Sequence, residues 1–88
     1  MASLDRDGVS IHYRVHGEPT DRAPLLLTHG YSSSASMWAP NLTGLGARRQ
    51  IITWDIRGHG QSDSPGRVEL YSEAASVGDM EAVLDAAG

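Results

Sequence analysis

Two turns in the chain hold residues whose types and spacing are suited to chemistry. The first turn, His29-Gly30-Tyr31, closes the apolar run Leu25–Thr28, and the second begins at Asp55 after the apolar run Ile51–Trp54. Short apolar runs that end in such turns are typical of strands buried in a parallel sheet. Because ligands of open α/β sheets bind beyond the carboxyl ends of the strands, we expect both turns to face a ligand.

The second turn reads Asp-x-Arg-Gly-His-Gly-x-Ser from Asp55 to Ser62. Two interpretations of its charged residues compete. Asp55 and Arg57 could act as an acid and as a cationic clamp for a developing oxyanion, or they could hold the loop backbone by hydrogen bonds. The two glycines permit the positive φ angles that a tight loop requires. His59 is open to the same two interpretations, as a proton carrier or as a loop residue.

About twenty residues separate the two apolar runs, which is enough for one crossover helix between parallel strands. The helix is expected to begin near Ser34 or Ala35, after serines that are suitable N-caps. It should fray before Arg48, because Pro40 and two glycines interrupt it. The sequence therefore predicts one βαβ unit, in which Leu25–Thr28 is buried on both faces.

The segment Val9–His16 alternates strictly between apolar and polar residues, which predicts a half-buried antiparallel strand. Asp7-Gly8 before it is a hairpin signal, so residues 2–6 are expected to pair back as a short edge strand. His12 and His16 fall on the polar face of the strand. They are candidates for catalysis or metal binding, but no carboxylate or third ligand accompanies them, and we interpret them as solvated strand residues.

A second amphipathic helix is predicted from about Ser72. Its apolar stripe should pack against the sheet, and the stripe comprises Val77, Met80, Val83, Leu84 and Ala87. The acidic residues are placed on the other faces of the helix, and they are Glu73, Asp79, Glu81 and Asp85. Glu73 is favourable at the positive amino end, and Gly88 is a suitable carboxyl-terminal cap.

Composition excludes several classes of function. The 88 residues carry seven arginines, eleven acidic residues and a net charge of −4, with the arginines scattered along the chain. This argues against binding to nucleic acid or to an anionic membrane surface. Without cysteine, neither a disulfide nor a thiolate metal site can form, and we expect no metal and no cofactor. The amino terminus lacks the pattern of a signal peptide, so the cytoplasm is the expected location.

Taken together, the His-Gly-Tyr turn and the later Asp-x-Arg-Gly-His-Gly-x-Ser turn resemble the α/β-hydrolase family. The resemblance covers residues 1–88 and implies an α/β fold, in which an antiparallel hairpin is followed by the βαβ unit and an amphipathic helix. The chain would be the amino-terminal part of a single, incomplete α/β-hydrolase domain. In that sheet, Ile51–Trp54 lies between Val9–His16 and Leu25–Thr28.

The resemblance also implies roles for the two turns. The backbone amide of Tyr31 would donate to the oxyanion of an acyl-transfer intermediate, and Gly30 and Ser32 beside it would contact the substrate. His29 would brace the loop. The second turn would be structural, and its members in that role are Asp55, Arg57, Gly58, His59 and Gly60.

One departure from the family pattern is consequential. No Gly-x-Ser-x-Gly nucleophile motif occurs in the chain, and no triad acid or triad histidine can be assigned. We therefore expect a fragment of an esterase-like or lactonase-like serine hydrolase for a small-molecule substrate. The fragment should be inactive alone, and its partner should be the remainder of the domain, as the same or a second polypeptide.

Three alternatives stay open. The complete protein could be an epoxide hydrolase or a dehalogenase, although Ser32 stands where epoxide hydrolases commonly have proline and Tyr31 lacks the side-chain donor of dehalogenases. It could be a non-catalytic binding or signalling protein on the same scaffold, because fold does not fix function. The chain could also be a mature product that acts as a structural partner of a second polypeptide.

Overall fold

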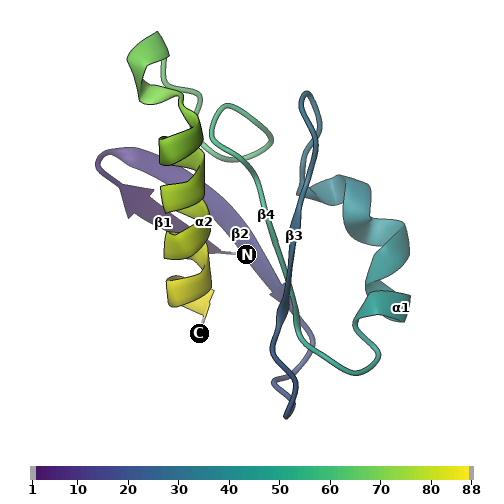
Figure 1. Ribbon diagram of the computed structural model, residues 1–88. Coiled ribbons are helices and arrows are strands. Elements are labelled where there is room, and N and C mark those ends of the chain that lie inside the picture. Colours follow the sequence, from purple (N-terminus) through teal and green to yellow (C-terminus); the bar gives the residue numbers. More distant parts are fainter. Residues whose placement is uncertain (1, 88) are drawn as a thin grey trace.

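A four-stranded mixed sheet organises the fold (Figure 1). The computed structural model describes residues 2–87, and its strands are β1 (Ala2–Arg6), β2 (Val9–His16), β3 (Leu25–Thr28) and β4 (Ile51–Trp54). Their order is β1-β2-β4-β3, in which β3 and β4 are parallel and the other pairs are antiparallel. The predicted sheet order is confirmed, with β4 between β2 and β3.

The hairpin between β1 and β2 is set by its turn residues. Asp7 and Gly8 have φ angles of 50° and 89°, the pair of positive values that a two-residue type I′ turn requires. The Asp5 carboxylate accepts a hydrogen bond from the Gly8 amide at 3.3 Å. The turn fixes the register in which Arg6 pairs with Val9, as the Asp-Gly signal predicts.

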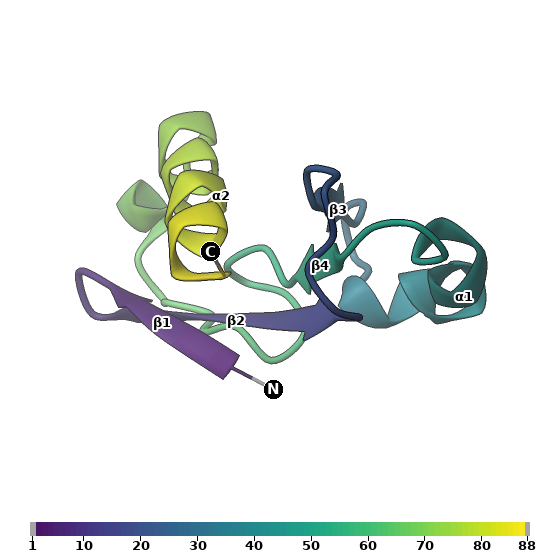
Figure 2. The ribbon, with the colours of Figure 1, turned by 90° about the horizontal axis from the view of Figure 1, so that it is seen from below.

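The helices cover different parts of the sheet (Figure 2). α2 (Glu73–Ala87) packs over β1 and β2, whereas η1 (Ala35–Asn41) contacts β3 and β4 and continues into the short α1 (Leu42–Leu45). A further 3₁₀ turn, η2 (Val68–Leu70), precedes α2. None of the helices within residues 2–87 has the length and apolarity needed to cross a membrane.

The core lies between α2 and the strands. Its buried members are Val9, Ile11, Ile52, Trp54 and Val83. β4 is buried along its whole length because a strand flanks it on each side. β3 differs from the expectation of burial on both faces, since only Leu27 is buried and Thr28 is exposed. The reason is that β3 is an edge strand of the described sheet.

The crossover helix begins at Ala35, where the sequence predicts it, but it is less regular than expected. Its first seven residues form η1 as a 3₁₀ helix, and α1 ends at Leu45, before Arg48. Pro40 lies inside η1 and has no amide to donate. No residue of η1 or α1 is buried. The missing donor and the weak packing together explain the 3₁₀ geometry.

α2 begins at Glu73, one residue after its predicted start. The Ser72 hydroxyl accepts a hydrogen bond from the Ala75 amide at 3.0 Å and caps the helix. Val83 is completely buried, whereas Val77 and Leu84 of the predicted apolar stripe are exposed. The buried face is therefore narrower than predicted. The cap expected at residue 88 lies outside the described residues.

A buried ion pair joins α2 to the loop after β4. The Arg57 guanidinium donates to both Asp79 carboxylate oxygens, at 2.7 and 2.8 Å, and to the Leu70 carbonyl at 2.7 Å. The hydrogen bond to Asp79 raises the pKa of Arg57 further, so the guanidinium stays charged. The prediction that Asp79 lies away from the packed face of α2 is wrong. Asp79 is completely buried, because it lies one helical turn before Val83 on the face that meets the sheet.

Candidate functional site

The two turns identified in the sequence lie next to each other beyond the carboxyl ends of β3 and β4. The first loop, residues 29–34, follows β3 and leads into η1 at Ala35, and the second loop, residues 55–63, follows β4. Three hydrogen bonds join them: Ile56 N to His29 Nε2 at 3.0 Å, Ser32 N to His59 Nε2 at 3.1 Å, and Ala35 N to Asp55 Oδ1 at 2.7 Å. The two loops therefore form one hydrogen-bonded unit.

Asp55 holds both loops with its carboxylate. The side chain is buried, and besides the Ala35 amide it accepts the Gln61 amide on Oδ2 at 3.0 Å. Gly60 has a φ of 50°, and a Cβ at this position would lie 2.5 Å from the Asp55 carboxylate. Only glycine allows the backbone to pass this close. Both carboxylate oxygens are engaged by amides, which is the geometry of a loop support.

Ser62 ends the second loop and connects it to β2. Its hydroxyl donates to the Asp55 carbonyl at 2.6 Å and accepts the His12 amide at 2.8 Å. The side chain is buried, and its donor is already used. Ser62 therefore has no free proton to lose as a nucleophile, and no base contacts its hydroxyl. Its position as the last residue of the Asp-x-Arg-Gly-His-Gly-x-Ser motif is the signal that could have indicated this anchoring contact.

Arg57 uses its donors within the fold. Its Nε, Nη1 and Nη2 groups bond to Asp79 and to the Leu70 carbonyl, and the side chain is buried. This arrangement favours the loop interpretation over the cationic clamp. Asp79 was not expected as the partner of Arg57, although its spacing of four residues from Val83 indicates that both lie on one face of the helix.

His29 links the loops through both ring nitrogens. Nδ1 donates to the Gly30 carbonyl at 2.7 Å, and Nε2 accepts the Ile56 amide at 3.0 Å. The ring is buried and lies 5.0 Å from the ring of His59. An imidazole whose nitrogens are both engaged by the backbone is placed to hold a loop and has no lone pair free for a substrate.

Tyr31 occupies the tip of the first loop. Its side chain is 92% exposed, and its ring stands edge-on to His59 with 5.9 Å between centroids. The Tyr31 amide donates no hydrogen bond to another residue of the described chain. Ser32, the next residue, has a φ of 63°, which is unusual for a residue with a side chain. The loop tip therefore carries a free backbone donor in a constrained turn.

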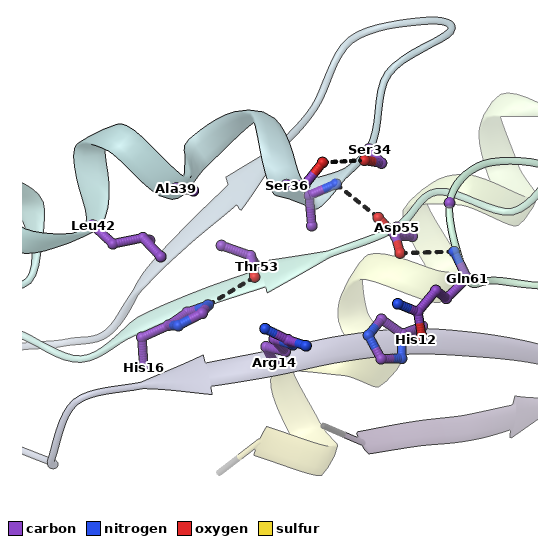
Figure 3. A pocket seen from close by; sticks show the side chains of 12 residues that line it. His12, Arg14, His16, Ser34, Ser36, Ala39, Leu42, Thr53, Asp55 and Gln61 are labelled. Atoms are coloured by element: carbon purple, nitrogen blue, oxygen red, sulfur yellow. Dashed lines mark hydrogen bonds between the residues drawn. The ribbon is translucent and has the colours of Figure 1, made fainter.

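A groove of about 280 Å³ lies on the face of the sheet between β2, β4 and η1 (Figure 3). Asp55 and Gln61 lie at one end of the groove, and Leu42 lies at the other. Tyr31 and Ser32 are not among the lining residues. The groove is therefore separate from the free amide at the tip of the first loop.

The two β2 histidines line this groove and differ in their surroundings. His12 is only 8% exposed, so its interpretation as a solvated residue is wrong. The reason is that Ser62 holds the second loop against this part of β2. His16 is half-buried, and its Nε2 lies 3.0 Å from Thr53 Oγ1. Burial, and after it the charge of Arg14, lowers the pKa of His16.

Metal binding has no set of ligands to support it in the described part of the chain. No three side chains among the histidines and acids of residues 2–87 come together as a possible metal site. His12 and His16 accordingly stand without a third ligand.

The chain is similar to known hydrolases over most of its length. A family model described as the alpha/beta hydrolase fold matches residues 23–88. The chain is 38% identical over 81 residues to a carbamate hydrolase RutD of Caulobacter vibrioides, covering 89% of this chain and 29% of the relative. It is 30% identical over 81 residues to Epoxide hydrolase 4 of Mus musculus, covering 92% of this chain and 22% of that protein.

A solved structure shows the same arrangement of elements. The structure of Est816, described as an N-acyl homoserine lactone degrading enzyme, matches with a TM-score of 0.84 and 33% identity, covering 97% of this chain and 31% of that one. The chain thus spans less than a third of the length of each of these relatives.

Proposed function

Because the chain belongs to the α/β-hydrolase fold family, we propose that it forms the amino-terminal part of a serine-type hydrolase and supplies one oxyanion-hole donor, the backbone amide of Tyr31. The observation that carries this proposal is the free Tyr31 amide beyond the end of β3, in a loop held by hydrogen bonds on both sides of the tip. A donor fixed before the reaction stabilises the negative charge of the transition state without further reorganisation.

The substrate class follows from this donor. A backbone amide in this role donates a hydrogen bond to a carbonyl oxygen that becomes negatively charged when a nucleophile attacks. Among the relatives, the names of the carbamate hydrolase and of the lactone-degrading enzyme refer to such carbonyl compounds. We therefore propose a small ester, lactone or related carbonyl substrate that contacts Gly30, Tyr31 and Ser32, without a cofactor and in the cytoplasm.

The remaining catalytic groups are proposed to come from further polypeptide. The chain contains no nucleophile motif. In the second loop, the buried hydroxyl of Ser62 is already hydrogen-bonded within the fold. Within residues 2–87, β3 is bonded to β4 on one side only, and natural proteins avoid leaving an apolar strand edge exposed because it pairs with other strands. A further parallel strand beside β3, from the same or a second polypeptide, would complete the sheet, and the chain alone would be inactive.

An epoxide hydrolase is the second candidate. The identity of 30% to Epoxide hydrolase 4 supports it, whereas Ser32 in place of the proline that is common in epoxide hydrolases argues against it. A non-catalytic binding protein on the same scaffold is the third. A panel of activated esters, lactones and epoxides separates the three, because each enzyme class turns over its own substrates and a binding protein turns over none.

The role of Tyr31 is tested by replacing its amide in the intact protein. The substitution Tyr31→Pro removes the donor, and we expect kcat to fall about 10²- to 10³-fold, equivalent to about 2.7–4 kcal/mol of transition-state stabilisation. Tyr31→Phe keeps the amide and should lower kcat only slightly. Both variants are assayed on a nitrophenyl ester, with thermal unfolding measured in parallel. A folded Tyr31→Pro variant with normal kcat would show that another group is the donor.

A further inference from the structure

The ring of His59 lies at the centre of the contacts that shape the first loop. Its Nε2 accepts the Ser32 amide at 3.1 Å, and its Nδ1 lies 3.2 Å from the Arg57 carbonyl. A carbonyl oxygen can only accept, so Nδ1 must carry the ring proton and Nε2 must present its lone pair. The backbone on both sides of the ring therefore selects one neutral tautomer of His59.

The residue that His59 holds is conformationally strained. Ser32 has a φ of 63°, in the left-handed region that residues with a side chain rarely adopt. Such a conformation persists only where the surroundings hold it. The hydrogen bond from the Ser32 amide to His59 is the contact that does so here. It also fixes the peptide group between Tyr31 and Ser32, because that amide belongs to the same plane as the Tyr31 carbonyl.

The same ring restrains Tyr31 through a second contact. The Tyr31 ring meets His59 edge-on, with an interplanar angle of 75° and 5.9 Å between centroids. His59 in turn packs against His29 at 5.0 Å, and His29 holds the Gly30 carbonyl. The residues before and after the Tyr31 amide are thus both fixed by an imidazole.

We propose that His59 is a positioning residue, which aims the Tyr31 amide by holding the strained Ser32 in place through the lone pair of Nε2. This inference rests on the proposed function of Tyr31. A side chain without an acceptor at this position would lose the hydrogen bond to the Ser32 amide and release the loop tip.

The groups around His59 do not replace the lost contact. The His29 ring is engaged by the backbone through both nitrogens, and the Arg57 guanidinium is paired with Asp79. The Asp55 carboxylate is occupied by two amides, and the Tyr31 ring, which carries a phenol, meets His59 edge-on. Among residues 2–87, none of the carboxylates forms an ion pair with His59.

Two substitutions at position 59 separate the hydrogen bond from the ring. His59→Phe keeps an aromatic ring beside Tyr31 but removes the acceptor, and we expect kcat at about pH 8 to fall about tenfold or more with little change in KM. His59→Gln places a side-chain oxygen near the position of Nε2 and should restore most of kcat. His16→Gln, which removes a histidine at the far end of the sheet, is the matched control and should leave kcat unchanged.

A measurement independent of activity follows the Ser32 amide itself. In the intact protein, we expect this amide to be protected from hydrogen exchange, because it donates to His59. His59→Gln should keep most of this protection, because its side-chain oxygen can accept the same hydrogen bond, and His59→Phe should lack it. This readout also applies if His59→Phe folds poorly, since the inference still requires His59→Gln to keep the protection.

The outcomes distinguish this inference from the proposed function. Normal kcat in both His59 variants, with a large loss in Tyr31→Pro, overturns the positioning role and leaves the oxyanion role intact. Equal losses in His59→Gln and His59→Phe, or an effect confined to KM, also overturn it. Normal kcat in Tyr31→Pro overturns the oxyanion role instead. Loss with phenylalanine, rescue with glutamine and matching changes in Ser32 protection support the inference.

Discussion

The loops that follow the two parallel strands have opposite properties. In the second loop, Asp55, Arg57 and Ser62 are only 4%, 6% and 5% exposed, and the side chains of all three are hydrogen-bonded within the fold. In the first loop, the Tyr31 side chain is 92% exposed and Ser32 has a positive φ. The second loop is anchored by buried, hydrogen-bonded side chains, whereas the first loop is exposed and strained at its tip.

The comparison shows how an exposed donor can be kept in place. The first loop makes few contacts of its own, and the amides of Ser32 and Ala35 are held by acceptors of the second loop. The second loop is anchored in turn to β2 through Ser62 and to α2 through Arg57. Support thus passes from the core, through the hydrogen-bonded second loop, to the first loop, whose Tyr31 amide has no partner within residues 2–87.

The largest expected effect comes from breaking the anchor between the second loop and α2. Asp79→Ala leaves the Arg57 guanidinium buried without its partner, and we expect a loss of about 3–5 kcal/mol in the free energy of unfolding. Urea unfolding of the intact protein measures this loss. Glu81→Ala, on an exposed position of the same helix, is the control and should change stability by less than about 0.5 kcal/mol. Similar values for the two variants would show that the ion pair does not support the loop.

A smaller loss is expected inside the second loop. Gly60→Ala forces a side chain into a positive φ and to within 2.5 Å of the Asp55 carboxylate, and we expect a loss of about 2 kcal/mol. Gly66→Ala is the matched control, because a Cβ at that position meets no atom within 4 Å. The unfolding midpoints of both variants are compared with that of the wild type. A Gly60→Ala variant as stable as Gly66→Ala would contradict the close packing of this loop.

Much of the fold could be predicted because the relevant signals are local. The alternation of residues in Val9–His16, the Asp-Gly turn and the crossover length predict the hairpin and the βαβ unit, and both predictions are confirmed. The position of β4 between β2 and β3 is also confirmed, but it was implied by the resemblance to the α/β-hydrolase family. The adjacency of the two turns follows from the direction of the parallel strands. Local patterns are sufficient here because strand faces and turn types depend on neighbouring residues.

The errors concern properties that depend on distant partners. Asp79 is buried because Arg57, far from it in the sequence, neutralises its charge, and His12 is buried because the second loop folds over β2. The hydrogen bond between Ser32 and His59 depends on the conformations of two loops and on one side-chain rotamer. Periodicity carries no information about such contacts, so this part of the candidate site had to come from the structure. The catalytic role of Tyr31 stays a prediction.

The smallest expected effect concerns His16, which lies beside the end of β4 opposite the two loops. His16 pairs with Ile51 at the start of that strand, whereas the two loops follow the carboxyl ends of β3 and β4. Burial and the charge of Arg14 lower the pKa of His16 below its ordinary value of 6.5. The unfolded chain therefore binds this proton more readily than the folded protein. The stability that neutral His16 permits is present above about pH 6.5 and is lost as the pH falls through the lower folded pKa.

The substitution His16→Gln removes this titration while keeping a side-chain group that can bond to Thr53. We expect the free energy of unfolding to decline less steeply between about pH 6.5 and pH 5 than in the wild type. Arg14→Gln should reduce the slope only in part, because burial is the larger cause of the lowered pKa. Neither variant should alter the protection of the Ser32 amide, since the loops are held by other histidines. If His16→Gln changed that protection as strongly as His59→Phe, the two ends of β4 would be coupled. The two loops would then not differ in the way their contacts indicate.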